Sequence, residues 1–145
     1  MKTFSDLLAT KQTLNLSIVL SPLFQTIVPE FSYELNGQTI LSEKLTSVLT
    51  LNTKLDLLAP INIKIALLNK NYNLDHSTAI VIERLAIDQL IVNPSMGLYT
   101  NDQNFQNPTN HLGFNGVWEL DIHQPFYQWR HQITNQGWLF YQNTN

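Results

Sequence analysis

The chain has 145 residues, a formal net charge of −3 and no cysteine, which excludes disulfide frameworks, thiolate metal sites and cysteine nucleophiles. Only 13% of the residues are charged, and the eight lysines and arginines are too scattered to form a basic stripe for nucleic acid. Polarity comes mainly from 16 asparagines and 11 glutamines. Such a neutral surface suits saccharides or close packing among identical subunits, and codon drift on an inert surface explains it equally well.

The length favours one domain over residues 1–145. No stretch reaches the ~18 apolar residues that a membrane span needs, and Asp6 and Lys11 interrupt the region where a signal peptide would lie. We therefore expect a protein made in the cytoplasm without a standard export signal, and no membrane partner.

Alternating apolar residues predict several strands in the first two thirds of the chain. Residues 14–20 alternate strictly, and Ser21 and Pro22 are expected to end that strand. Asn36-Gly37 lies between two short alternating runs, which predicts a hairpin with a type I′ turn. Residues 45–57 fit either a strand or a helical turn, whereas residues 61–67 alternate clearly. A central strand is expected around residues 80–82, with a bend near 84–88 and a further strand at 90–92.

Residues 93–113 are rich in proline, glycine and asparagine, which predicts a long surface loop. This loop holds four apolar side chains with no predicted strand to bury them: Met96, Leu98, Tyr99 and Phe105. We expect these four residues to contact another protein subunit. Deleting residues 97–107 should then leave the monomer folded but abolish its association.

Seven of the fifteen aromatic residues lie in residues 116–142. Trp118 shares one face of a half-buried strand with Leu120 and Ile122, so we expect it to be more than about 90% buried. A short helix is predicted over residues 125–136, because proline is tolerated in a first helical turn and Gly137 is a natural stop. Most of these aromatics should fill the core, which leaves Tyr127 and Tyr141 to face a ligand.

Together these elements predict an all-β fold, an antiparallel β-sandwich of the jelly-roll type with at least seven strands and one short helix near the C-terminus. A barrel is the alternative.

Glu119, Asp121 and His123 alternate on one strand face and would lie about 7 Å apart in turn. Such a row could act as an acid–base pair or hold a metal, but it is also typical of a solvated strand face. Asp75 and Asp102 offer oxygens to Ca²⁺ without the spacing of an EF-hand loop. Nucleophile-elbow, phosphate-loop and dinucleotide motifs are missing from the sequence. We therefore predict no catalytic residue, no metal site and no enzymatic activity.

Residues 61–92 resemble the central part of calcium-dependent xylan-binding β-sandwich modules. Residues 61–67 correspond to that family's first strand, Asn69 to its asparagine, and residues 79–87 to its second strand, with Asp75 in the loop between them. The resemblance implies a β-sandwich and brings Ca²⁺ and a glycan into consideration as ligands. However, Lys70 stands where the family has an acidic ligand, and its like charge would disfavour a cation there.

Two functions fit these observations. The first is a structural component of an assembly, such as a small virion protein made in the cytoplasm, with other subunits or its own copies as partners. The alternative is a carbohydrate-binding module that recognises host glycans, for which Tyr99, Phe105, Tyr127 and Tyr141 would supply exposed aromatic rings.

Overall fold

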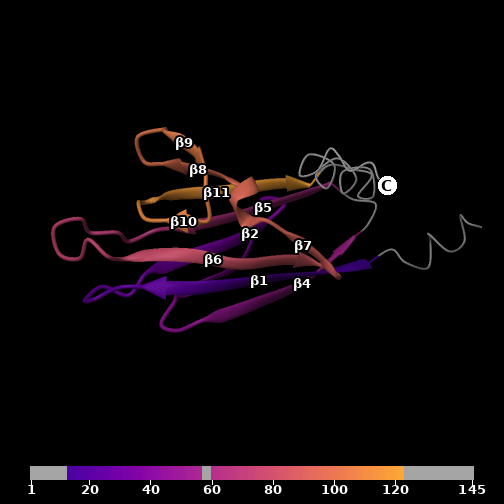
Figure 1. Cartoon of the computed structure of the whole chain (residues 1–145), viewed down its shortest axis with the longest axis horizontal. Helices are drawn as coiled ribbons and strands as arrows, with labels where there is room; N and C mark the ends of the chain where they lie inside the picture. Colours follow the sequence, from indigo (N-terminus) through magenta and orange to yellow (C-terminus); the bar gives the residue numbers. More distant parts are fainter. Residues whose placement is uncertain (1–12, 57–59, 123–145) are drawn as a thin grey trace, which may run out of the picture.

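The computed structural model describes residues 13–56 and 60–122 as two antiparallel β-sheets packed face to face (Figure 1). The first sheet has five strands in the order β10–β6–β1–β4, with β7 also paired to β6. Its strands are β1 (Thr13–Leu23), β4 (Leu49–Asp56), β6 (Ala79–Ile87), β7 (Leu90–Val92) and β10 (His111–Leu112). The predicted antiparallel β-sandwich is confirmed.

The second sheet has six strands in the order β3–β2–β5–β11–β8–β9. Its strands are β2 (Glu30–Leu35), β3 (Gln38–Lys44), β5 (Ile61–Leu67), β8 (Leu98–Asn101), β9 (Gln106–Pro108) and β11 (Gly116–Ile122). The described ranges thus exceed the predicted minimum of seven strands. The segment expected to be either strand or helical turn forms β4, since alternate leucines of β4 pack into the core.

The core lies between the two sheets and is filled by the alternate residues that the sequence pattern marks as inward-facing. Trp118 on β11 is 0% exposed, as predicted, and its indole Nε1 donates a hydrogen bond of 3.0 Å to the carbonyl of Pro94. Tyr33 on β2 reaches across the core, where its hydroxyl lies 2.8 Å from the hydroxyl of Thr53 on β4. The core is therefore apolar, with polar atoms only where a partner is in reach.

The predicted hairpin joins β2 and β3 through Asn36 and Gly37, whose φ angles are 53° and 81°. Positive φ at both central residues is the geometry of a type I′ turn. The turn also continues the ladder to β5: Asn36 N–H donates to the Asn62 carbonyl at 2.8 Å, and its side-chain oxygen accepts from Asn62 N–H at 2.7 Å.

Strand β1 continues through Ser21 and Pro22 to Leu23, so the predicted end at the proline is wrong. Its pairing with β4 stops at Leu20 opposite Leu49, and beyond that point only β6 remains as a neighbour. A proline is tolerated there because the strand has become an edge. The extension carries Leu23 to one end of the sandwich.

The bend expected at residues 84–88 lies at the end of that range, because β6 continues to Ile87, and the further strand expected at residues 90–92 is β7. A β-bulge in β6, opposite Val19 and Leu20 of β1, leaves Glu83 without a register partner, so Glu83 and Arg84 are both exposed while the strand continues. The chain reverses at Asp88, which has a φ of 52°.

Residues 93–113 are not a structureless loop. They contain a 3₁₀ turn (Pro94–Met96) and the strands β8, β9 and β10. The sequence pattern missed β8 because a four-residue strand shows little periodicity, and its place in the sheet comes from pairing with β11. Residues 97–107 include Gly97, which lies against the Trp118 indole, and all of β8, which pairs with β11 so that Tyr99 lies opposite Trp118. We therefore expect their deletion to unfold the sandwich, contrary to the sequence-based prediction.

The described residues do not include the predicted helix at residues 125–136, nor do they include His123, Tyr127 and Tyr141. Within the described ranges, no helix has the length and apolar character needed to cross a membrane.

Candidate functional site

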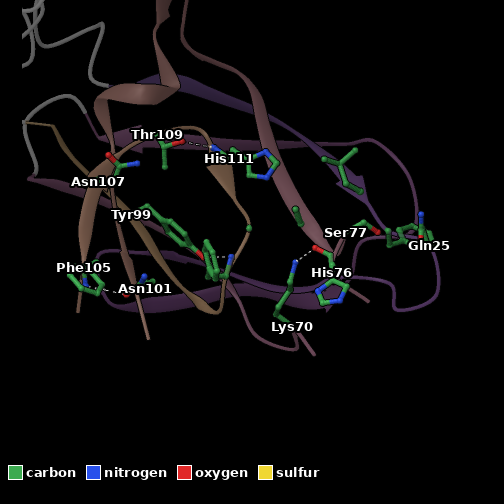
Figure 2. Close-up of a pocket in the computed structure, with 15 residues that line it drawn as sticks. Gln25, Lys70, His76, Ser77, Tyr99, Asn101, Phe105, Asn107, Thr109 and His111 are labelled. Atoms are coloured by element: carbon green, nitrogen blue, oxygen red, sulfur yellow. Dashed lines mark hydrogen bonds between the residues drawn. The ribbon is translucent and has the colours of Figure 1, made fainter. Parts of the chain in front are cut away.

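The loops at one end of the sandwich, on the left in Figure 1, border a hollow with a volume of about 770 Å³. Its walls come from the end of β1, the β5–β6 loop, the β8–β9 hairpin and the segment from β9 to β11 (Figure 2). The lining residues are Leu23, Phe24, Gln25, Lys70, His76, Ser77, Ala79, Tyr99, Asn101, Phe105, Asn107, Thr109, His111, Gly113 and Phe114.

Aromatic rings are the largest apolar groups of the hollow. Phe24, Phe105 and Phe114 are 38%, 68% and 52% exposed, although phenylalanine is ordinarily buried. The Phe114 ring is held in place by Tyr72, with 5.8 Å between ring centroids and an interplanar angle of 35°. Tyr99 is buried, which raises the pKa of its phenol, and its hydroxyl accepts a hydrogen bond of 3.2 Å from Phe114 N–H. The hollow thus presents three exposed rings, and Tyr72 supports that of Phe114.

Neutral polar groups make up most of the rest of the lining. Gln25, Asn101 and Asn107 supply amides, and Ser77 and Thr109 supply hydroxyls. Among the described residues, the lining includes neither aspartate nor glutamate. This combination of exposed rings with amides and hydroxyls suits a neutral ligand that has both apolar faces and hydroxyl groups.

Asp75 fastens the β5–β6 loop to the turn that follows β1. Its Oδ2 accepts from the backbone N–H groups of Gln25, Thr26 and Ile27 at 2.9, 2.7 and 2.8 Å. Its Oδ1 accepts from the N–H and hydroxyl of Ser77 at 2.9 and 2.6 Å. The Ser77 hydroxyl, followed by these backbone donors, holds the pKa of the Asp75 carboxyl far below its usual range.

Lys70 fastens the same loop from inside. It is only 8% exposed, and its Nζ donates to the carbonyl oxygens of His76 and Thr78 at 2.6 and 2.7 Å. Burial lowers the pKa of the ammonium, and the negative charge of Asp75 acts in the opposite direction. Nζ also lies 5.8 Å from the centre of the Tyr72 ring, within the range of a cation–π contact.

Two asparagines complete the support of this loop. Asn69 donates to the carbonyl of Val28 at 2.9 Å and accepts from Glu30 N–H at 2.7 Å. Asn115 accepts from Lys70 N–H at 2.7 Å and donates to the Lys70 carbonyl at 3.1 Å. The loop is therefore tied to both of its neighbours in space, before β2 and before β11.

The β8–β9 hairpin forms the opposite wall. Its turn is organised by Asn101, whose side-chain oxygen accepts from the N–H groups of Gln103 and Phe105 at 2.9 and 3.0 Å. Asn104 adopts a φ of 66°, which asparagine tolerates better than most residues. The turn holds Phe105 outward beside the hollow (Figure 2).

The structure separates the four residues predicted to form an interaction loop. Tyr99 and Phe105 both line the hollow, but only Phe105 is exposed. Met96 and Leu98 are 37% and 45% exposed and are not part of its lining. Their contact with another subunit stays a prediction.

Sequence reasoning missed Phe24, Phe114, His76 and His111 as residues of one site. Phe114 had a usable signal, because an aromatic ring between Gly113 and Gly116 has little local structure to bury it. The two histidines had none. His111 in β10 and His76 in the β5–β6 loop come together only through the sheet topology.

The side chains of Glu119 and Asp121 alternate with the buried Trp118 and Leu120 on β11 and so lie on the outer face of the second sheet. Asn62 on the neighbouring β5 donates through Nδ2 to Glu119 Oε2 and Asp121 Oδ1, both at 2.6 Å. These two carboxylates thus belong to a hydrogen-bonded strand surface. His123, the third member of the predicted row, lies outside the described residues.

Neither a protein-family model nor a curated protein matches this chain. Two solved structures share its fold. One is vCBM60 in complex with galactobiose, with a TM-score of 0.53 and 11% identity over 74% of this chain and 97% of that one. The other is the selenomethionine form of vCBM60, with a TM-score of 0.53 and 10% identity over 74% of this chain and 90% of that one. That form is described in connection with a circular permutation that links two families of calcium-dependent carbohydrate-binding modules. The resemblance noted in residues 61–92 is therefore confirmed at the level of the fold.

The oxygens around the β5–β6 loop do not fit a calcium ion. Calcium requires six to eight oxygen ligands, usually with several carboxylates. In the part of the chain that the structure describes, no group of three or more histidine, cysteine, aspartate or glutamate side chains could hold a metal. Both carboxylate oxygens of Asp75 already accept hydrogen bonds from the chain. Asp102 belongs to the β8–β9 hairpin, and its Oδ2 accepts a hydrogen bond of 3.4 Å from the Tyr72 hydroxyl.

Proposed function

We propose that this chain is a non-catalytic carbohydrate-binding module, and that the hollow at the loop end of the sandwich receives the saccharide. The observation that carries the proposal is the pairing of exposed phenylalanines with neutral amides in one concave site. Sugar rings have apolar C–H faces that pack on aromatic rings, and their hydroxyls exchange hydrogen bonds with amides. Phe105 and Phe114 would supply the rings, and Asn101, Asn107 and Gln25 the amides.

The expected ligand is a neutral oligosaccharide. An acidic sugar would need a free cation, but the lysine of the lining already donates to two backbone carbonyls. The fold of vCBM60, which was solved in complex with galactobiose, supports a glycan as the class of ligand.

The comparisons favour this function over the structural component of an assembly that the sequence also suggested. Association through Phe105 is retained as an outcome of the test, because an exposed aromatic ring would serve a protein partner as well as a sugar.

The test is a screen against an array of neutral oligosaccharides, followed by calorimetric titration of the best ligand. Phe105→Ala and Phe114→Ala should each weaken binding about tenfold, equivalent to roughly 1.4 kcal/mol. Ile40→Ala is the matched control, because Ile40 is an exposed apolar residue on β3, at the opposite edge of the sheet from β8 and β9. If no glycan bound and sedimentation showed oligomers that Phe105→Ala dispersed, the assembly function would replace this one.

A further inference from the structure

We propose that the ammonium group of Lys70 takes the place of a bound metal cation in ordering the β5–β6 loop, so that the hollow binds its ligand without calcium. The role of Lys70 in the loop stands on the loop's own geometry. The statement about ligand binding rests on the proposed function.

Two backbone carbonyls of the loop converge on Nζ of Lys70. His76 and Thr78 are two residues apart, and both turn their carbonyl oxygens inward to the same ammonium, at 2.6 and 2.7 Å. Figure 2 shows Lys70 reaching His76 on this wall of the hollow. Converging backbone carbonyls need a donor between them, and the ammonium of Lys70 supplies donors whose charge strengthens both bonds.

The Asp75 carboxylate of the same loop is already occupied by hydrogen bonds. Asp75 receives five donors, three on Oδ2 and two on Oδ1. A carboxylate offers about four lone-pair positions, so these donors occupy its capacity. A metal ion could bind Asp75 only by displacing the backbone N–H groups that hold the loop to the turn after β1, or the two Ser77 donors within the loop.

Three side-chain amides in and near the loop also accept hydrogen bonds from the backbone. Asn71 accepts from the N–H groups of Asn73 and Leu74, each at 3.1 Å. The oxygens of Asn69 and Asn115 are engaged by Glu30 N–H and Lys70 N–H. The oxygens of these three amides therefore stabilise the chain itself.

The positive charge of Lys70 also disfavours a metal ion at this position. A divalent cation at these carbonyls would lie beside a buried ammonium and would be repelled by it. It would also remove the only hydrogen-bond partners that the described residues give Nζ, and a buried charge without partners is costly. Lys70 is thus a positioning residue, because His76 and Ser77 line the hollow only while this loop keeps its shape.

The first experiment uses the wild-type chain. Its thermal unfolding midpoint is measured in millimolar calcium and in excess chelator, and calcium alone is titrated by calorimetry. We expect the two midpoints to agree within about 1 °C and no heat of specific binding. A midpoint that rises with calcium concentration would overturn the proposal, because a ligand of the native state stabilises by mass action.

The second experiment compares Lys70→Met with Lys54→Met, in which an exposed lysine of β4 undergoes the same change. Lys70→Met leaves the part-buried carbonyl of His76 and the buried carbonyl of Thr78 without their donor and should lower the thermal midpoint by roughly 5–10 °C. Lys54→Met should change it by less than about 2 °C. Equal midpoints for the two variants would contradict the role of Lys70, and the wild-type calcium titration still decides the question if Lys70→Met does not fold.

The third experiment separates this inference from the proposed function. The affinity for the best neutral oligosaccharide is measured in calcium and in chelator. Equal affinities support the inference. Binding that requires calcium would overturn it while leaving the carbohydrate-binding function intact, and absence of any glycan binding would reject that function while the unfolding measurements still test Lys70.

Discussion

The β5–β6 loop and the β8–β9 hairpin both border the hollow, but they are held in different ways. The loop is fixed along its length by side chains: Asp75 and Asn69 bind backbone groups of other segments, and Lys70 binds carbonyls of the loop itself. The hairpin is fixed at its base, where Gly97 lies against the buried Trp118, while its tip is organised mainly by its own Asn101, with one contact of 3.4 Å between Asp102 and the Tyr72 hydroxyl. Polar contacts therefore shape the β5–β6 loop, whereas core packing anchors the β8–β9 hairpin. The exposed ring of Phe105 at the tip of that hairpin is left available to a ligand.

The largest effect is expected at the base of the hairpin. Trp118→Ala removes a fully buried indole and should cost about 3–5 kcal/mol of unfolding free energy, measured by urea denaturation. If the variant unfolded with the stability of the wild type, the packed base of the hairpin would be disproved.

The next effect belongs to the polar loop and depends on pH. The folded-state pKa of Asp75 is lowered, so the carboxylate stabilises the fold above its unfolded pKa of about 3.9, and this contribution is lost as pH falls further toward the folded value. Asp75→Asn should therefore be less stable than wild type at neutral pH, and the difference should shrink between roughly pH 5 and 2. The exposed Asp102→Asn is the control. A difference that did not change with pH would show that the carboxylate's charge is not what holds the loop.

A smaller effect is expected at Gly97. A Cβ at this position would lie 2.2 Å from Trp118 Cε2, so Gly97→Ala forces the indole or the backbone to move and should cost about 1–3 kcal/mol. Because the clash requires the indole, the cost should fall in a Trp118→Phe background, which a double-mutant cycle measures. Additive costs would mean that Gly97 and Trp118 do not act together.

The smallest effect on stability is expected at the hairpin tip. Phe105 is 68% exposed, so Phe105→Ala should change the unfolding free energy by less than about 0.5 kcal/mol while weakening glycan binding. A large loss of stability in the same denaturation assay would place the ring in the fold rather than in recognition.

Much of the sandwich could be predicted from local pattern. Alternation alone identified the strands that contain Leu16, Ile63 and Trp118, because one face of each is buried and a period of two follows. Asn36-Gly37 identified its turn because few other pairs tolerate positive φ at both positions. The similarity of residues 61–92 to calcium-dependent modules likewise indicated the correct fold.

Only the tertiary structure decided the site. Strand β8 is too short to show a period, so its pairing with β11, and with it the burial of Tyr99, could not be inferred locally. Phe24, His76, Phe105 and Phe114 come from four separate connections, and the sheet order brings them to one end of the sandwich. The sequence alone determined that Lys70 stands where an acidic residue was expected. The fold determined that its ammonium meets the carbonyls of His76 and Thr78, because these partners depend on the shape of the β5–β6 loop, which Asp75 holds against the turn after β1.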